Sequence, residues 1–120
     1  MKLRIKGNTI RFRLTQTELD KINTGSVEDQ TCFPGGNSFT YKIQKGKSYS
    51  TEFAQDVLTI TVPAKIINDW VTTDKVGIEN SVGLTDGSRL DILLEKDFKC
   101  LTERPTENES DMFPNPLEKH

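Results

Sequence analysis

Cysteine and histidine are scarce in this chain, and their scarcity excludes several kinds of site. The 120 residues include two cysteines, Cys32 and Cys100, and one histidine, His120. These residues make no recognisable zinc pattern, so we expect no metal and no cofactor. Cysteine–histidine and serine–histidine–aspartate catalysis would lack a base unless the terminal His120 folded into the site. Because no export signal is evident, we expect two reduced thiols rather than a disulfide.

Long apolar runs are also missing. None approaches the roughly 20 residues that a membrane helix needs, and the opening residues MKLRIKGN lack the apolar segment of a secretory signal. A cytoplasmic location is therefore expected. Apolar residues make up only 33% of the chain, which predicts a thin, β-rich core, and the formal net charge is -2. That charge argues against nucleic acid and membrane as partners.

The first 22 residues predict a hairpin followed by a helix. Residues 2–6 and 9–14 alternate polar and apolar side chains, as strands with one buried face do. Gly7-Asn8 suits the turn between them. The polar face of this hairpin would carry Lys2, Arg4, Lys6, Arg11 and Arg13. Thr15 and Glu18 fit a capping box at the start of a short helix.

A second copy of this pattern follows after a shift of 48 residues. Ile10, Phe12 and Leu14 match Leu58, Ile60 and Val62, while Val27 would match Val76. We therefore predict an α+β fold with two short helices. It would be a pseudo-twofold curved sheet or small β-barrel from two ββαββ repeats, over residues 2–44 and 50–96. The alternative is that two unrelated halves of a small α+β chain happen to align.

The remaining segments predict further elements and one change of composition. Strands are expected at residues 26–33, 38–44, 49–53, 57–62, 75–80 and 88–96, with a second helix at 63–71. Trp70 lies on the apolar face of that helix, which favours a core position over ligand stacking. Residues 1–101 would form one domain. Residues 102–120 would form an acidic, proline-containing tail that is extended or mobile, with Phe113-Pro114 able to dock back.

The first candidate site is the basic face of the opening hairpin, which has five cations and no acidic residue between positions 1 and 14. Such a ladder can hold phosphate or another anion. Two other interpretations are open. In one, the cations pair across strands with Glu and Asp or face solvent; in the other, the acidic tail covers them.

The second candidate site is the stretch from Glu95 to Cys100, where Lys96 and a thiol lie at the end of the last strand. A flanking lysine can lower the pKa of a thiol and make it nucleophilic. The alternative is an ordinary strand end with a half-buried cysteine. An enzyme acting on a small anionic substrate would use Cys100 or Glu95 in the chemistry and the arginines as a clamp.

A third candidate is nucleic-acid binding. Residues 58–67, followed by Asp74-Lys75-Val76, resemble the strand, proline, helix and strand of AbrB-type transcription factors, which are swapped-hairpin barrels that bind DNA as dimers. The likeness covers about twenty residues and lacks the basic residue usual near the helix start beyond Lys65. The likeness therefore indicates a shared fold element more than it indicates DNA binding.

Three segments in order resemble a family of small bacterial proteins of unknown function. They are the opening MKLRIKGNTIRFRLTQTEL, the late EKDFKCL, and the tail element from Asp111 to Pro116. The resemblance spans essentially the whole chain and implies a stand-alone cytosolic protein, but it implies no activity.

The leading hypothesis is a small non-enzymatic binding or interaction module, whose basic hairpin binds a small anion or a protein partner. Its candidate ligand-binding residues are Arg4, Lys6, Arg11, Arg13, Glu95, Lys96 and Cys100. Whether the chain is an enzyme stays open, and the anionic-substrate enzyme and the AbrB-like DNA binder remain the alternatives.

Overall fold

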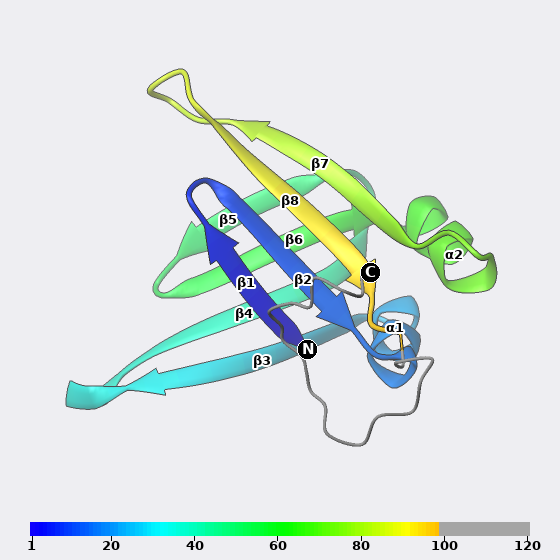
Figure 1. Ribbon diagram of the computed structural model, residues 1–120, viewed down its shortest axis with the longest axis horizontal. Coiled ribbons are helices and arrows are strands. Elements are labelled where there is room, and N and C mark those ends of the chain that lie inside the picture. Colours follow the sequence, from blue (N-terminus) through cyan, green and yellow to red (C-terminus); the bar gives the residue numbers. More distant parts are fainter. Residues whose placement is uncertain (99–120) are drawn as a thin grey trace, which may run out of the picture.

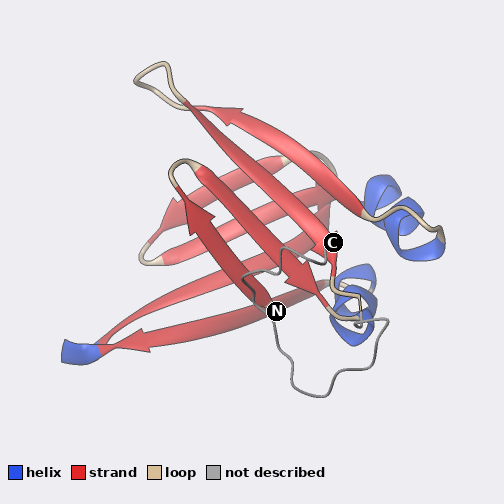
Figure 2. Cartoon of the chain, in the orientation of Figure 1, coloured by secondary structure: helices blue, strands red, loops and turns tan. Residues whose placement is uncertain are grey.

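The computed structural model describes residues 1–98, and these residues form eight strands and two helices (Figures 1 and 2). The strands are β1 (Lys2–Lys6), β2 (Thr9–Leu14), β3 (Ser26–Phe33), β4 (Asn37–Gly46), β5 (Ser50–Ala54), β6 (Val57–Pro63), β7 (Gly77–Gly83) and β8 (Arg89–Lys96). The helices are α1 (Gln16–Asn23) and α2 (Ala64–Thr72), and a short 3-10 turn, Pro34–Gly36, joins β3 to β4. No helix in this part of the chain has the length and apolarity required to cross a membrane.

The strands form two open sheets, in the orders β1-β2-β8-β7 and β3-β4-β6-β5. Each sheet joins a hairpin from the first half of the chain to a hairpin from the second half. The joints are parallel pairings of β2 with β8 and of β4 with β6. The α+β class is thus confirmed, but the predicted barrel is wrong. Among the described strands each sheet has two edges that pair with nothing, so neither sheet closes on itself.

Local signals place the turns and the first helix where the sequence predicts them. Gly7 has a φ of 55°, and Gln55 and Asp56 have φ values of 53° and 64°, as tight hairpin turns require. The capping box of α1 is present. The amide of Glu18 donates to the Thr15 hydroxyl at 3.3 Å, and the Thr15 amide donates to the Glu18 carboxylate at 2.8 Å.

The core lies between the two sheets, and the helices close one end of the molecule (Figure 1). Its buried members are Ile10, Phe12, Leu14, Leu19, Ile22, Val27, Tyr41, Ile43, Leu58, Ile60, Val62, Ile67, Trp70, Ile78, Ile92 and Leu94. Trp70 is fully buried, which confirms its predicted core position, and its indole donates to the Val76 carbonyl at 3.1 Å. Ile5 shares the inner face of its strand but is 57% exposed.

Matched hydrogen bonds occur in the two halves of the chain. Where the hairpin turns meet the central strands, the Asp91 amide donates to the Asn8 carbonyl, and the Thr40 amide donates to the Asp56 carbonyl, both at 2.9 Å. At the helix ends, two lysine side chains donate to backbone carbonyls. Lys45 reaches Asn23, the last residue of α1, at 2.5 Å, and Lys96 reaches Thr73, the residue after α2, at 2.7 Å.

The strand register corrects one detail of the predicted alignment between the halves. Val27 pairs with Ile43, and Ile78 pairs with Leu94 in the corresponding place. Val76, which the predicted alignment matched to Val27, takes no part in this pairing. Val76 is 53% exposed and precedes β7, which begins two residues later than the strand predicted at 75–80.

Candidate functional site

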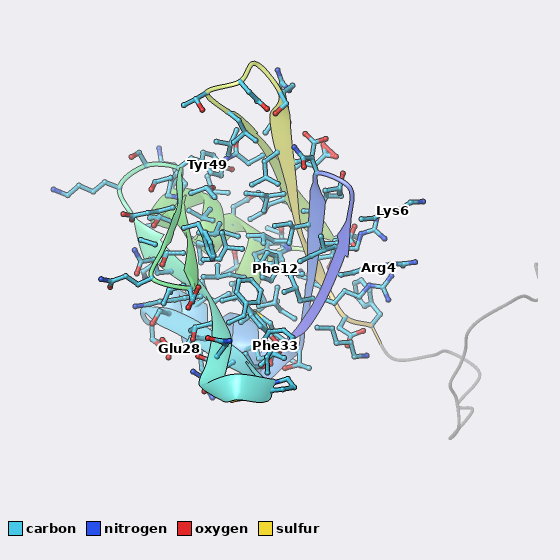
Figure 3. The ribbon with its side chains drawn as sticks, turned by 90° about the vertical axis from the view of Figure 1, so that its left-hand side faces the viewer. Arg4, Lys6, Phe12, Glu28, Phe33 and Tyr49 are labelled. Atoms are coloured by element: carbon cyan, nitrogen blue, oxygen red, sulfur yellow. The ribbon has the colours of Figure 1, made fainter. Side chains whose placement is uncertain are left out.

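The outer face of the β1-β2-β8-β7 sheet carries most of its cations on two neighbouring strands, with Arg89 at the start of β8 as an exception. The cations Lys2, Arg4, Lys6, Arg11 and Arg13, here called the basic ladder, lie on β1 and β2. Acidic residues lie on the other two strands, with Asp91 and Glu95 on β8 and Glu79 on β7. Figure 3 shows Arg4 and Lys6 pointing away from the body of the molecule. The ladder therefore forms one border of the sheet, because β1 is an edge strand.

Three members of the basic ladder pair with carboxylates at the end of β8. Lys2 Nζ lies 3.1 Å from Asp97 Oδ2. Arg11 Nε and Arg13 Nε lie 3.6 Å and 3.9 Å from Glu95 Oε1, which is close enough for electrostatic attraction but too long for a good hydrogen bond. For these three cations, the interpretation that they pair across strands is correct.

The other two members have no such partner. Among residues 1–98, neither Arg4 nor Lys6 forms a salt bridge, and both side chains are exposed. Arg4 also lies directly opposite Arg11 in the β1–β2 register. Like charges placed opposite each other on a sheet destabilise it by roughly 0.2–1 kcal/mol. An anion bound at this point would remove that penalty.

The ladder surrounds a small hollow. A concavity of about 140 Å³ is lined by Lys2, Leu3, Arg4, Arg11 and Arg13. Pockets that enclose a drug-sized molecule are typically about 300–1,000 Å³. The hollow therefore suits one carboxylate or phosphate group of a larger partner, rather than a whole metabolite.

The N-terminus fixes the start of the edge strand. The Met1 ammonium pairs with the Glu18 carboxylate on α1 and lies 3.2 Å from Asp29 on β3. Burial disfavours the charge of this ammonium, but the two carboxylates outweigh burial and raise its pKa. Burial likewise opposes the charge on Glu18, but bonds from the N-terminus and Thr15 prevail and lower its pKa. These contacts hold Lys2 at one end of the sheet.

The second predicted cluster is not brought together in the described residues. Glu95 faces the arginines, whereas the Lys96 ammonium caps the end of α2 at Thr73. Cys100 lies outside the described residues. The hollow that contains Arg11 and Arg13 does not include Glu95 among its lining residues. Within residues 1–98, Glu95 is thus a counter-ion of the ladder.

The segment that resembles AbrB-type proteins forms β6 and α2, followed by a connection. Asp74, Lys75 and Val76 are not a strand, because β7 begins at Gly77. Lys65 is an exposed residue of α2, away from the basic ladder. The predicted strand of the AbrB pattern is therefore wrong, and this segment adds no cation to the outer face of the first sheet.

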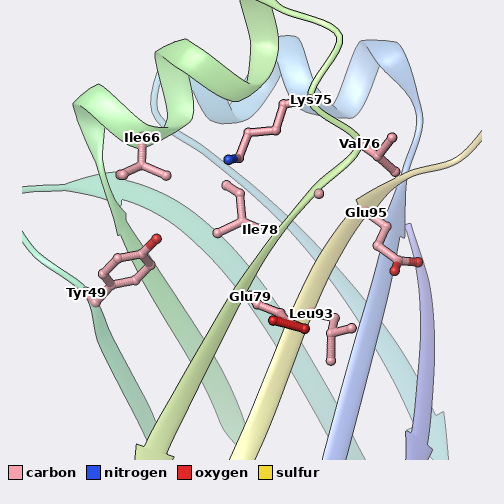
Figure 4. A pocket seen from close by; sticks show the side chains of 9 residues that line it. Tyr49, Ile66, Lys75, Val76, Ile78, Glu79, Leu93 and Glu95 are labelled. Carbon is pink, nitrogen blue, oxygen red and sulfur yellow. The ribbon is translucent and has the colours of Figure 1, made fainter.

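A second hollow, of about 500 Å³, lies at the opposite edge of the same sheet (Figure 4). Figure 4 shows Tyr49, Ile66, Lys75 and Ile78 on one side of β7, with Glu79, Leu93 and Glu95 on the other. Burial raises the pKa of Tyr49. Because the charged groups lie on opposite sides of the strand, they do not converge on a common point, and this hollow lacks the geometry of a catalytic site.

Sequence reasoning did not assign Asp91, Asp97 or Glu79 to the charged face. Their membership depends on β8 lying beside β2 and on β7 lying beside β8. A local pattern does not reveal either pairing. The alternation of β8 alone is the signal that could have placed Asp91 and Glu95 on one face.

The fold and the site together define a two-sheet α+β protein with a basic edge strand. The chain belongs to a family described as "Family of unknown function (DUF7009)", whose model matches residues 1–117. This confirms the resemblance to a family of unknown function that the three sequence segments indicated. No curated protein and no solved structure matches the chain.

Proposed function

We propose that the protein is a non-enzymatic binding module that captures an extended acidic segment of a partner protein along β1. The observation that carries this proposal is the exposure of Arg4 and Lys6 on an edge strand, without a counter-ion among residues 1–98. An edge strand offers unpaired backbone donors and acceptors to an added strand. Alternating cations would then select carboxylates at every second position of the added segment.

The size of the hollow favours a polypeptide over a free metabolite. About 140 Å³ accommodates one acidic group, so useful affinity must come from several groups arranged along the ladder. Lys2, Arg4 and Lys6 lie two residues apart, which is the side-chain period of an extended chain. This arrangement supports a strand-like acidic ligand.

The experiment is a fluorescence anisotropy titration with a fluorescein-labelled peptide that carries glutamate at every second position. The double variant Arg4→Glu/Lys6→Glu should abolish binding to the full chain. A matched control, Lys47→Glu/Lys65→Glu, changes the net charge equally but leaves β1 intact, and it should bind almost as the wild type does. Equal binding by both double variants would contradict the proposal.

We also propose that the two halves are structural repeats related by a pseudo-twofold axis, with residues 1–101 as one domain and 102–120 as its tail. The matched strand orders support the repeat, because β1-β2-β8-β7 corresponds to β5-β6-β4-β3 when each element is replaced by its counterpart. The paired lysine caps at Asn23 and Thr73 support it too. Within this repeat, only the first copy carries the basic site, because β6 has Thr59 and Thr61 at the positions that match Arg11 and Arg13 of β2.

A further inference from the structure

The cations of β1 have a regular spacing that a matching segment can recognise. Lys2, Arg4 and Lys6 occupy alternate positions and share the outer face of the sheet. β1 pairs only with β2 among the described strands, so its other edge is open to one more strand. A strand in parallel register on this edge would place its own alternate side chains beside the three cations.

The same chain contains a segment with the complementary spacing. Glu107, Glu109 and Asp111 also occupy alternate positions, within the stretch TENESD at residues 106–111. The nearest prolines, at 105 and 114, lie outside it, so each residue from 106 to 113 retains the backbone N–H that a strand ladder uses. The family match runs to residue 117 and therefore includes this segment.

The path from β8 to β1 is short enough for this segment to arrive there. Asp97, just after β8, already lies 3.1 Å from Lys2. From β8 across β2 and β1 to an added strand is three strand spacings, or roughly 14 Å at about 4.8 Å each. Residues 98–106 span up to about 30 Å when extended. The chain can therefore cross the sheet and place Glu107 beside Lys2.

We propose that residues 107–111 lie along the open edge of β1 in parallel, with Glu107 beside Lys2, Glu109 beside Arg4 and Asp111 beside Lys6. The segment then supplies the counter-ions that Arg4 and Lys6 lack among residues 1–98. This inference rests on the proposed function, since both assign the same basic ladder. It adds a regulatory element: a partner's acidic segment binds only by displacing the chain's own.

A tethered segment competes strongly because its local concentration is in the millimolar range for a short linker. Neutralising it should therefore strengthen binding of an external peptide. The next residues, Met112 and Phe113, would follow Lys6 toward the end of β1, where Ile5 is 57% exposed. In this register Ser110 lies beside Ile5, and Met112, two positions further on, shares the inner face with Ile5.

The test compares two full-length triple variants that remove the same charge. In Glu107→Gln/Glu109→Gln/Asp111→Asn the proposed segment is neutral, whereas Glu28→Gln/Glu103→Gln/Glu118→Gln leaves it intact. The first variant should bind the alternating glutamate peptide about tenfold more tightly than the wild type does, and the control should bind within about twofold of it. Amide hydrogen exchange in β1 should become faster in the first variant only.

A charge swap tests the register. Arg4→Glu should speed exchange of the β1 amides, and adding Glu109→Arg should restore the protection. Adding Glu107→Arg instead, which places the cation one pair away, should restore much less. Equal rescue by the two arginines would overturn the proposed register.

The outcomes separate this inference from the proposed function. If peptide binding depends on Arg4 and Lys6 but is identical in both triple variants, the basic ladder binds partners and the intramolecular segment is refuted. If amide exchange in β1 responds to the segment as predicted but no variant binds the peptide, the ladder binds residues 107–111 of its own chain. The proposed partner is then refuted. Unchanged exchange together with no binding refutes both.

Discussion

Replacing Glu95 with glutamine distinguishes a counter-ion from a catalytic carboxylate. Glu95 Oε1 lies 3.6 Å from Arg11 Nε and 3.9 Å from Arg13 Nε. Glutamine keeps the shape of the side chain but removes the charge that both guanidinium groups share. We expect Glu95→Gln to weaken folding and to strengthen binding of an acidic peptide, because two cations of the ladder lose their internal competitor.

The magnitude follows from the exposure of the three side chains. At about 4 Å and an effective dielectric constant of about 20, two unit charges attract by about 4 kcal/mol before desolvation and side-chain entropy are counted. Measured exposed pairs retain about 0.2–1 kcal/mol. The arginine side chains are 35% and 47% exposed and Glu95 is 27% exposed. Losing both pairs should therefore lower the free energy of unfolding by about 0.5–2 kcal/mol.

The assay is urea unfolding at low and high salt, followed by the fluorescence of Trp70, the single tryptophan of the chain. Salt should shrink the difference between Glu95→Gln and wild type, because it screens partly exposed pairs. Glu79→Gln is the control, since Glu79 lies on the same face but forms no salt bridge within residues 1–98. An unchanged stability, or a weaker peptide affinity in Glu95→Gln, would refute the assignment.

Two further predictions concern the architecture and its pH dependence. Lys45→Met and Lys96→Met each remove a side-chain hydrogen bond to a backbone carbonyl at the C-terminal end of a helix. Each should lower the free energy of unfolding by about 0.5–1.5 kcal/mol without altering peptide affinity, and costs that differ by several-fold would contradict equivalent halves. Glu18 has a lowered pKa, so its stabilising contribution is complete above its ordinary value of 4.5 and is lost as pH falls through the lowered value. Glu18→Gln should flatten this acid limb in thermal melts between about pH 2 and 5, and an unchanged limb would rule out the contribution.

Short-range features of the fold could be predicted because short-range chemistry determines them. The hairpin turns at Gly7 and at Gln55-Asp56, the capping box at Thr15 and Glu18, and the buried face of α2 all depend on residues a few positions apart. The outward direction of the basic ladder follows from alternation alone. These features describe the hairpins and helices but not their partners.

The arrangement of the hairpins could not be predicted in the same way. The parallel pairing of β2 with β8 joins Arg13 to Glu95 across most of the described chain, and alternation in either strand is equally satisfied by other neighbours. The barrel was predicted from the same patterns, but barrel closure depends on whether edge strands meet. The role of Lys96 likewise depends on the position of the end of α2 beside β8, which is a tertiary feature.

The most direct test of the basic ladder as a binding surface is a two-dimensional NMR titration of the 15N-labelled full chain with the alternating glutamate peptide. The amide shifts should change chiefly in β1 and β2, at residues 2–6 and 9–14, while β6 and α2 stay unchanged. Shifts centred on the hollow around Tyr49 and Lys75, or no shifts in β1 at peptide concentrations that saturate binding, would contradict the account.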